Sequence, residues 1–407
     1  MSRLPGGPWA WLVALAVVSF LLPALSYGTR DADSRLHAEI AARLSAQPVS
    51  RWIAPEWPPG WYVSGPYVEH PVGFFLVPAA LGRMGYPPAQ AAYLANAAWQ
   101  IASLLLAAAL ARTFASGIEA GALLFLFQLV PIAFTYRIRA NHEQTLLLLL
   151  LVALYATERT RTRSRWAPVL AGALVGMVLV KGLVGLMGVP VCALWLLARG
   201  DEDTTRRGVV GAWAALSAGV VAIGLATAAY EALYRGATGG SFIAAYLGRQ
   251  VGPATASQSE ALLAQKAYNL VWYLGRLLWF PFPWSLAALL AAWTGAKAVA
   301  RGAPRSESRT ALRGLAFSLG VAALYAGLFS LSDRRADRYI FPAYFAVAAA
   351  GAVAAMRDWP PMTRLAARLD RWPAWSPAAL WLLLVLLHVA GGRILHLPTI
   401  KLWAPDS

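Results

Sequence analysis

The stretch Thr29-Arg-Asp-Ala-Asp-Ser-Arg-Leu-His-Ala-Glu-Ile-Ala-Ala-Arg-Leu44 directly follows the first long apolar run of the chain, Trp9–Tyr27. Three aliphatic residues recur in it at every fourth position: Leu36, Ile40 and Leu44. This spacing predicts a short amphipathic helix that lies on the surface of a bilayer. Asp33 and His37 are one turn apart on a neighbouring stripe of the same helix. A span followed by such a helix indicates where the chain leaves the membrane.

The composition places the rest of the chain in a membrane as well. The chain is 59% hydrophobic and 13% charged, and its mean hydropathy is +0.53. Repeated long apolar runs of this kind are typical of polytopic α-helical membrane proteins. Because polar stretches are no longer than loops and surface helices require, we predict one integral domain over residues 1–407. Trp9–Tyr27 lacks a convincing cleavage site and is interpreted as a retained span.

Cysteine and charge exclude several classes of protein. Cys192 is the only cysteine of the chain, which excludes intrachain disulfides and sites with several thiolate ligands. The formal charge of +16 could indicate nucleic-acid binding. In a chain this apolar it more often reflects cytoplasmic loops and contacts with anionic lipids, so nucleic acid is not expected as a partner.

The apolar runs define the predicted spans. They are Trp9–Tyr27, Val72–Met84, Gln90–Ala111, Ile118–Tyr136, Thr145–Ala156, Ala167–Val180, Leu183–Ala198, Gly208–Tyr230, Leu277–Val299, Leu312–Leu331, Tyr339–Met356 and Trp375–Gly392. Val72–Met84 has 13 residues, fewer than the roughly 20 that a spanning helix needs. If this run crossed the membrane, the cluster Arg159–Arg165 would lie outside, against the positive-inside rule.

If Val72–Met84 instead lies at the surface or re-enters, every dense arginine cluster falls on one side. We therefore predict an all-α polytopic membrane protein with about 11 transmembrane helices and the N-terminus inside. Two large extracytoplasmic loops follow, at residues 28–89 and 231–276, and the first contains amphipathic juxtamembrane helices. Thr145–Ala156 and Ala167–Val180 are short for full spans, so either their polar flanks lie deep or their boundaries extend further.

Five polar patterns are predicted to converge on the extracytoplasmic face. They are Asp33 with its helix, Tyr67-Val-Glu-His-Pro71, Tyr136-Arg-Ile-Arg-Ala-Asn-His-Glu143, Val180-Lys-Gly182 and Ser332-Asp-Arg-Arg-Ala-Asp-Arg-Tyr-Ile-Phe-Pro342. Only four of the 35 basic residues are lysines, and Lys181 lies between two apolar runs, where an ionisable group is costly. It is either functional, with an anionic partner, or a lysine that reaches the surface from a helix end.

The other polar groups also have two interpretations each. Arg334, Arg335 and Arg338 lie on the side that the positive-inside rule disfavours, which favours phosphate binding over an orientation signal. Asp33 could be a solvated surface acid. Glu143 could simply cap a helix that begins at Gln144, since an acid is favourable at a helix N-terminus.

Metal binding is left open by the histidines. His37, His70 and His142 do not form a strong metal-ligand spacing, although a divalent ion held by Asp33 with His37, or by Glu69 with His70, is conceivable.

The order of the five patterns resembles that of the GT-C glycosyltransferases, specifically the branch with the protein O-mannosyltransferases and the lipid A aminoarabinose transferase. The family has an acid after the first span, a Tyr-Phe-Glu-Lys-Pro or His-Pro-Pro element, an Arg…acid corner, a Lys-Gly turn and an Arg…Tyr-x-x-Pro element. The similar elements here are Asp33, Tyr67–Pro71, Arg139–Glu143, Lys181-Gly182 and Arg338–Pro342. Three positions depart from the family: Ser34 replaces Glu, Glu143 stands where Asp is common, and His70 replaces Lys.

The resemblance implies an inverting glycosyltransferase that moves a sugar from a polyprenyl-phosphate-linked donor to an acceptor on the extracytoplasmic face. It implies that Asp33 is the general base. The leaving lipid phosphate is a stable anion, so it requires positive charge rather than a general acid. The residues expected to bind the donor phosphate or sugar are Tyr67, Glu69, His70, Glu143, Lys181, Arg335, Arg338 and Tyr339. The lipid tail is expected beside Val72–Met84, and Tyr246 with residues 248–259 could cover the site.

The acceptor stays open among lipids, glycans and proteins. Abundant alanine and the preference for arginine over lysine are typical of a GC-rich bacterial genome, which favours the bacterial inner membrane with the site facing the periplasm. Two other classes are a lipid-linked glycan flippase or transporter, which would more often carry mid-span charges and repeats, and a multispan glycan polymerase or ligase, whose large loop usually comes late. A non-catalytic scaffold is a further alternative, and Ser34 is the best argument for it.

Overall fold

The computed structural model describes residues 32–61, 63–111, 113–114, 126–127, 130–136, 139–200, 205–250, 262–301, 306–362 and 364. Within these ranges the regular secondary structure is helical, apart from one isolated bridge between Glu56 and Pro66. The all-α prediction is therefore confirmed. The predicted spans Trp9–Tyr27 and Trp375–Gly392 lie outside the described residues.

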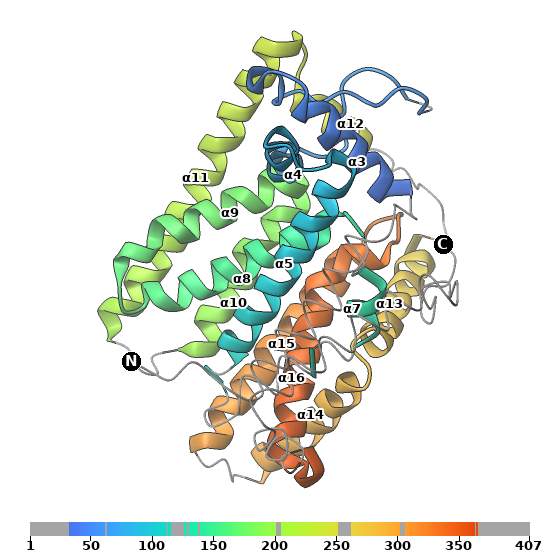
Figure 1. The fold of residues 1–407 in the computed structure, drawn as a ribbon. Coiled ribbons are helices and arrows are strands. Elements are labelled where there is room, and N and C mark those ends of the chain that lie inside the picture. Colours follow the sequence, from blue (N-terminus) through green and yellow to red (C-terminus); the bar gives the residue numbers. More distant parts are fainter. Residues whose placement is uncertain are drawn as a thin grey trace, which may run out of the picture.

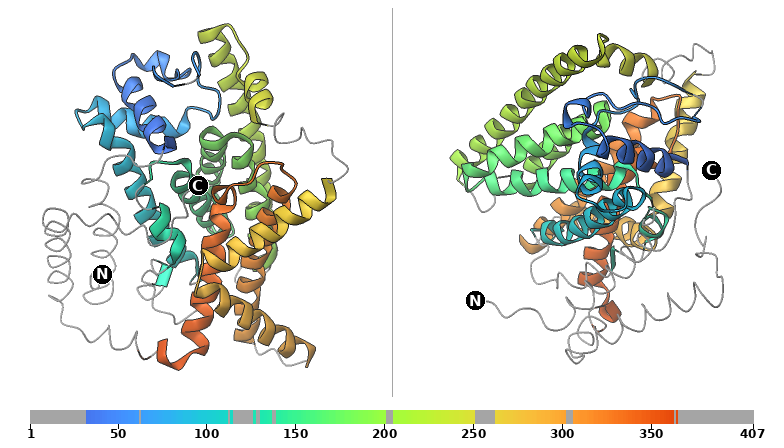
Figure 2. Two further views of the ribbon diagram at one scale, coloured as in Figure 1. Left: turned by 90° about the vertical axis from the view of Figure 1, so that its right-hand side faces the viewer. Right: turned by 45° about the horizontal axis from the view of Figure 1, so that its top comes forward.

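The helices pack side by side, and α5 lies against α8 and α16 (Figure 1). In chain order they are α3 (Ala32–Ser45), α4 (Gly73–Arg83), α5 (Pro88–Ala111), α7 (Pro131–Tyr136), α8 (His142–Thr160), α9 (Ala167–Lys181), α10 (Gly188–Arg199), α11 (Arg206–Thr238), α12 (Phe242–Gln250), α13 (Leu262–Trp279), α14 (Trp284–Ala300), α15 (Ser306–Ser330) and α16 (Phe341–Asp358). The 3-10 helices are η2 (Val49–Arg51), η3 (Ser164–Trp166), η4 (Gly182–Met187) and η6 (Asp337–Ile340). In the left view of Figure 2, the blue α3–α4 segment lies at one end of the bundle.

Five helical stretches are long and apolar enough to cross a membrane. They are Gln90–Ala111, Ser164–Arg199, Arg206–Thr238, Thr310–Ser330 and Asp337–Asp358. A sixth candidate is the pair α13–α14, which is bent by 104°. The chain is thus a multi-pass membrane protein. The number of about 11 spans stays a prediction, because these stretches come from the described residues only and the other parts of the chain are not counted.

The stretch Ser164–Arg199 reverses direction at η4. The Lys181 ammonium lies 2.6 Å from the Glu143 carboxylate, at the start of α8, whereas the Arg199 guanidinium lies 3.2 Å from the Glu158 carboxylate, near its end. Since the two acids lie at opposite ends of one helix, α9 and α10 run in opposite directions. The sequence predicted this arrangement as two short runs that flank a Lys-Gly turn.

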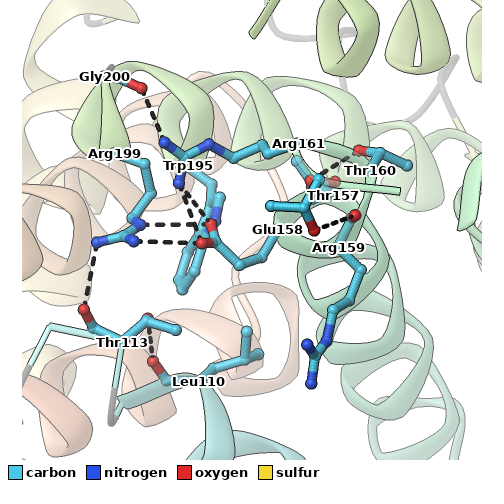
Figure 3. Close-up of polar contacts among 11 residues, drawn as sticks. Leu110, Thr113, Thr157, Glu158, Arg159, Thr160, Arg161, Trp195, Arg199 and Gly200 are labelled. Atoms are coloured by element: carbon cyan, nitrogen blue, oxygen red, sulfur yellow. Dashed lines mark hydrogen bonds and ion pairs between the residues drawn. The ribbon is translucent and has the colours of Figure 1, made fainter. Parts of the chain in front are cut away.

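A buried polar cluster lies at the C-terminal end of α8 (Figure 3). The Glu158 carboxylate accepts hydrogen bonds from Trp195, Arg161 and Arg199, at 2.9, 3.0 and 3.2 Å. The two guanidiniums also donate to the carbonyls of Gly200 and Thr113. Paired and hydrogen-bonded charges are tolerated in an interior, so this cluster joins the ends of α5, α8 and α10.

Helix α4 has 11 residues, too few to span, as predicted for Val72–Met84. It packs against the protein so closely that a Cβ at Gly73 would lie 2.6 Å from the Leu179 carbonyl oxygen of α9. Its Leu76 and Val77 side chains remain exposed.

Two expectations need correction. The aliphatic stripe of α3 was expected to lie on the bilayer, but Leu36, Ile40 and Leu44 are buried in a protein cluster that includes Phe75 of α4. The run Leu277–Val299 was expected to form one span. Instead α13 ends at Trp279, α14 begins at Trp284, and the two prolines between them, Pro281 and Pro283, interrupt the helix.

Candidate functional site

The site begins with a contact between two segments that are far apart in the chain. Asp33 lies in the first turn of α3, and its carboxylate accepts a hydrogen bond from the Arg338 guanidinium of η6. Both side chains are partly exposed, at 44% and 38%. A carboxylate and a cation, 305 positions apart in the sequence, therefore meet at one accessible point.

Ser34 fixes this end of α3 to the corner before α8. Its hydroxyl donates to the Asn141 side-chain oxygen at 3.2 Å and accepts from the Ala140 backbone N–H at 2.9 Å. Ser34 is fully buried, and its small side chain allows this close approach. The departure from the family's Glu at this position therefore has a structural role: it orients the helix that carries Asp33.

Behind Asp33 lies a buried ion pair. The Lys181 ammonium donates to Glu143 Oε1 at 2.6 Å, and the side chains are 4% and 2% exposed. Glu143 is in the first turn of α8 and Lys181 is in the last turn of α9, where the helix dipoles favour these charges. Glu143 Oε2 has no hydrogen-bond partner among the described residues. Removal of either partner would leave a buried charge uncompensated.

Three imidazole rings pack beside this pair. The ring centroids of His37 and His142 are 4.4 Å apart, and those of His70 and His142 are 4.1 Å apart. His37 Nδ1 lies 3.2 Å from the Ala140 carbonyl oxygen, to which it can donate. Burial lowers the pKa of His70 well below its usual value, and the charges of Lys181 and His37 lower it further. His70 is therefore neutral at pH 7.

The loop before α4 supplies the other expected residues. Tyr67 is buried against Trp57 and Phe75, and burial raises the pKa of its hydroxyl well above the usual value. Glu69 Oε1 lies 3.2 Å from the Nε of Arg249, which belongs to α12. The same guanidinium lies over the Trp57 ring, 5.3 Å from its centroid.

Helix α12 also covers the Lys181-Gly182 turn. The Leu183 backbone N–H donates to the Tyr246 hydroxyl at 3.1 Å. A Cβ at Gly182 would lie 2.3 Å from that hydroxyl oxygen, and the φ of Gly182 is +55°. Glycine is required here for both reasons. The expected cover is thus represented by Tyr246, while residues 251–259 lie outside the described residues.

The turn at 332–340 is held by several contacts. The Asp333 carboxylate accepts a hydrogen bond from Lys266, and Asp337 lies 3.0 Å from Arg276. Arg335 lies over the Tyr268 ring at 4.5 Å, and Tyr339 stacks on Phe329 at 5.5 Å. α13 therefore positions the turn from which Arg338 reaches Asp33.

The structure brings most of the expected residues into three contacts. Asp33 meets Arg338, Glu143 meets Lys181, and His70 lies against His142. Arg335 and Tyr339 instead contact aromatic rings on α13 and α15, and the Tyr67 hydroxyl has no hydrogen-bond partner among the described residues.

Sequence reasoning missed Arg249 and gave no role to His142. Arg249 has no local signal, since it is one of many arginines in the chain. His142 could have been noticed because it directly precedes Glu143.

The chain is similar to one protein family by sequence and to several solved structures by fold. Residues 69–230 match the family described as dolichyl-phosphate-mannose-protein mannosyltransferase. ArnT from Cupriavidus metallidurans bound to undecaprenyl phosphate is similar with a TM-score of 0.63 and 20% identity, over 95% of this chain and 66% of ArnT. The apo state of ArnT is similar with a TM-score of 0.57 and 18% identity, over 96% of this chain and 66% of ArnT.

The oligosaccharyltransferase from Archaeoglobus fulgidus in complex with Zn and sulfate gives a TM-score of 0.50 and 14% identity, over 91% of this chain and 52% of that protein. The chain thus spans less than two thirds of the length of these proteins. No protein of curated function matches the chain by sequence.

Proposed function

We propose a function that proceeds from the fold. This multi-pass membrane protein has the GT-C glycosyltransferase fold, a resemblance that the family match and the solved structures confirm. The protein is proposed to move a sugar, with inversion, from a polyprenyl-phosphate-linked donor to an acceptor on the extracytoplasmic face. The contact between Asp33 and Arg338 carries this proposal, because it joins a candidate base to a candidate phosphate ligand at an accessible point.

In the proposed reaction, a hydroxyl or amine of the acceptor attacks the anomeric carbon of the donor sugar. Asp33 takes the proton of the attacking group. The bond between the anomeric carbon and the phosphate oxygen breaks, and polyprenyl phosphate leaves with the electron pair. Arg338 is paired with Asp33 in the structure, and its guanidinium would turn from the carboxylate to the phosphate, on the other side of the anomeric carbon, to stabilise the negative charge that grows there. Attack from the face opposite the leaving group inverts the anomeric configuration.

The lipid part of the donor is supported by two observations. ArnT from Cupriavidus metallidurans is bound to undecaprenyl phosphate in one of its structures. In this chain, α4 exposes Leu76 and Val77 next to the loop that carries Glu69 and His70. An isoprenoid tail would lie along these side chains.

The membrane side is proposed from the charges. Arg161 and Arg199 lie at the end of α8 opposite Glu143, together with the arginine cluster that the positive-inside rule assigns to the cytoplasm. Asp33 and Arg338 would then face the periplasm of a bacterial inner membrane.

The test is transfer of label from radiolabelled polyprenyl-phosphate sugars in membranes that contain wild type, Asp33→Asn or Glu39→Gln. Glu39 is a matched control, because it is an acid of the same helix that pairs with Trp61 and Arg35 instead. We expect Asp33→Asn to lower transfer by about 10²–10⁴-fold, the usual contribution of a general base, and Glu39→Gln to stay near wild type. Undiminished transfer by Asp33→Asn, with equal insertion, would exclude Asp33 as the base.

A further inference from the structure

We infer that Arg249 takes the place of a divalent cation as the counter-charge of Glu69, so that sugar transfer by this protein needs no metal ion. The inference rests on the proposed function, and it gives a role to a residue that has no local sequence signal. Arg249 is treated as a positioning residue, since it acts on substrate through Glu69.

The contact itself joins the loop before α4 to helix α12, which lies far away in the sequence. Arg249 Nε and Glu69 Oε1 are 3.2 Å apart, and the side chains are 35% and 29% exposed. The Trp57 ring lies under the guanidinium, which fixes its plane. Figure 1 shows α12 at the same end of the molecule as α3, the helix that carries Asp33. The positive charge at Glu69 is therefore provided and oriented by the fold.

The candidate metal ligands do not fit a divalent ion. Among the described residues, no group of three His, Cys, Asp or Glu side chains comes together as a metal site. In the pair Asp33 and His37, the carboxylate is already bound by Arg338 and the ring faces the Ala140 carbonyl. In the pair Glu69 and His70, the carboxylate is bound by Arg249, and the buried His70 Nδ1, which has no hydrogen-bond partner among the described residues, is left as the single free ligand.

Electrostatics adds a second argument against a metal at this position. Asp33, Glu69 and Glu143 each face a cation, namely Arg338, Arg249 and Lys181. Lys181 is also close enough to disfavour the protonated form of His70. A divalent ion bound by Glu69 and His70 would therefore have to displace Arg249 from the carboxylate, and the charge of Lys181 disfavours a further positive charge at His70. A guanidinium supplies one positive charge there without this conflict.

The first experiment measures metal directly. Wild-type protein in detergent is dialysed against a chelator, its metal content is measured by mass spectrometry, and transfer is then assayed with and without added Zn²⁺, Mn²⁺ or Mg²⁺. We expect much less than one bound metal per chain and equal transfer, within twofold, in all conditions. About one retained metal per chain, or a tenfold loss that a metal restores, would overturn the inference. If wild type transfers no sugar under any condition, the proposed function fails, and the metal content still tests the role of Arg249.

The second experiment separates the positioning role from general stability. Arg249→Gln is expected to lower kcat/KM at least tenfold, and Arg249→Lys is expected to keep more than a third of it. Arg235→Gln is the matched control, because Arg235 pairs with Glu231 in the same part of the chain and should stay within twofold of wild type.

A double-variant cycle completes the test. If Arg249 acts only through Glu69, Glu69→Gln with Arg249→Gln should lose no more than Glu69→Gln alone. Losses that multiply, or an Arg249→Gln variant as active as wild type, would contradict the inference.

Discussion

Three acidic side chains of the candidate site are each bound by a cation from a distant part of the chain. Glu69 is 180 positions from Arg249, and Glu143 is 38 positions from Lys181. Asp33 and Arg338 are the most distant pair. The order of the polar patterns identified five of these six residues. It could not predict the pairing, because a pairing depends on how helices pack and not on any local period.

The histidine cluster makes stability depend on pH. His70 is neutral in the folded protein, since burial, Lys181 and His37 all lower its pKa. Its other neighbours in the cluster are His142 and the Glu143–Lys181 pair. In the unfolded chain the pKa is close to the ordinary value of about 6.5, so the unfolded state binds more protons below that pH. The contribution to stability is complete above about pH 6.5 and is lost as the pH falls from there toward the folded pKa.

We therefore expect the unfolding temperature of wild type to fall between about pH 7 and pH 5, and His70→Gln to show a shallower fall. One proton is worth at most about 1.4 kcal/mol per pH unit. Thermal unfolding in detergent across this pH range is the measurement. Parallel curves for the two proteins would show that His70 does not contribute.

At the scale of elements, the turn between α9 and α10 controls how α12 docks. Gly182 has a backbone conformation that favours glycine, and the Tyr246 hydroxyl fills the space where a Cβ would lie. α12 also carries Arg249. A change at the turn should therefore be transmitted to Glu69 through one short helix.

Gly182→Ala is expected to cost about 2–4 kcal/mol, from backbone strain together with the clash at Tyr246, and to lower transfer. Gly172→Ala is the matched control in α9, because a Cβ there meets nothing within 4 Å, and it should be neutral or slightly stabilising. Thermal unfolding and transfer are measured for both. Equal stability of the two variants would argue against the close contact.

Sequence patterns predicted helices better than they predicted breaks. The run Gln90–Ala111 is a single candidate span in the structure, with the same bounds. α13 was not predicted, because polar residues interrupt its first half: Lys266 pairs with Asp333, and Asn269 donates to the Ser332 carbonyl. Those contacts exist only after the 332–340 turn has folded against the helix. Whether this segment forms a helix therefore depends on contacts with residues that are far away in the sequence.

For the whole molecule, the side of the membrane is the main prediction that remains to be tested. The chain offers a convenient background, because its only cysteine, Cys192, is fully buried. Single serine-to-cysteine changes can therefore report on each face. Ser241 lies just before α12, and Ser164 lies in the arginine-rich turn after α8.

We expect Ser241→Cys to react with a membrane-impermeant maleimide in intact cells, and Ser164→Cys to react only after permeabilisation. The reason is that the arginine cluster should stay in the cytoplasm. Labelling of Ser164→Cys in intact cells would invert the topology and place Asp33 on the cytoplasmic side. Wild type, with buried Cys192, provides the unlabelled control.

Helix α8 has an acid in its first turn and another in its last, and different helices bind the two. Glu158 lies 15 positions after Glu143, which corresponds to a rise of about 22 Å. Adding one residue would shift one acid by about 1.5 Å and 100° relative to the other. No single rotation of the helix could then satisfy both Lys181 and Arg199. Both ion pairs can therefore form only when the helix between the two acids has this number of residues. We conclude that α8 can vary in the identity of its outward side chains, whereas the number of residues between its two acids is fixed.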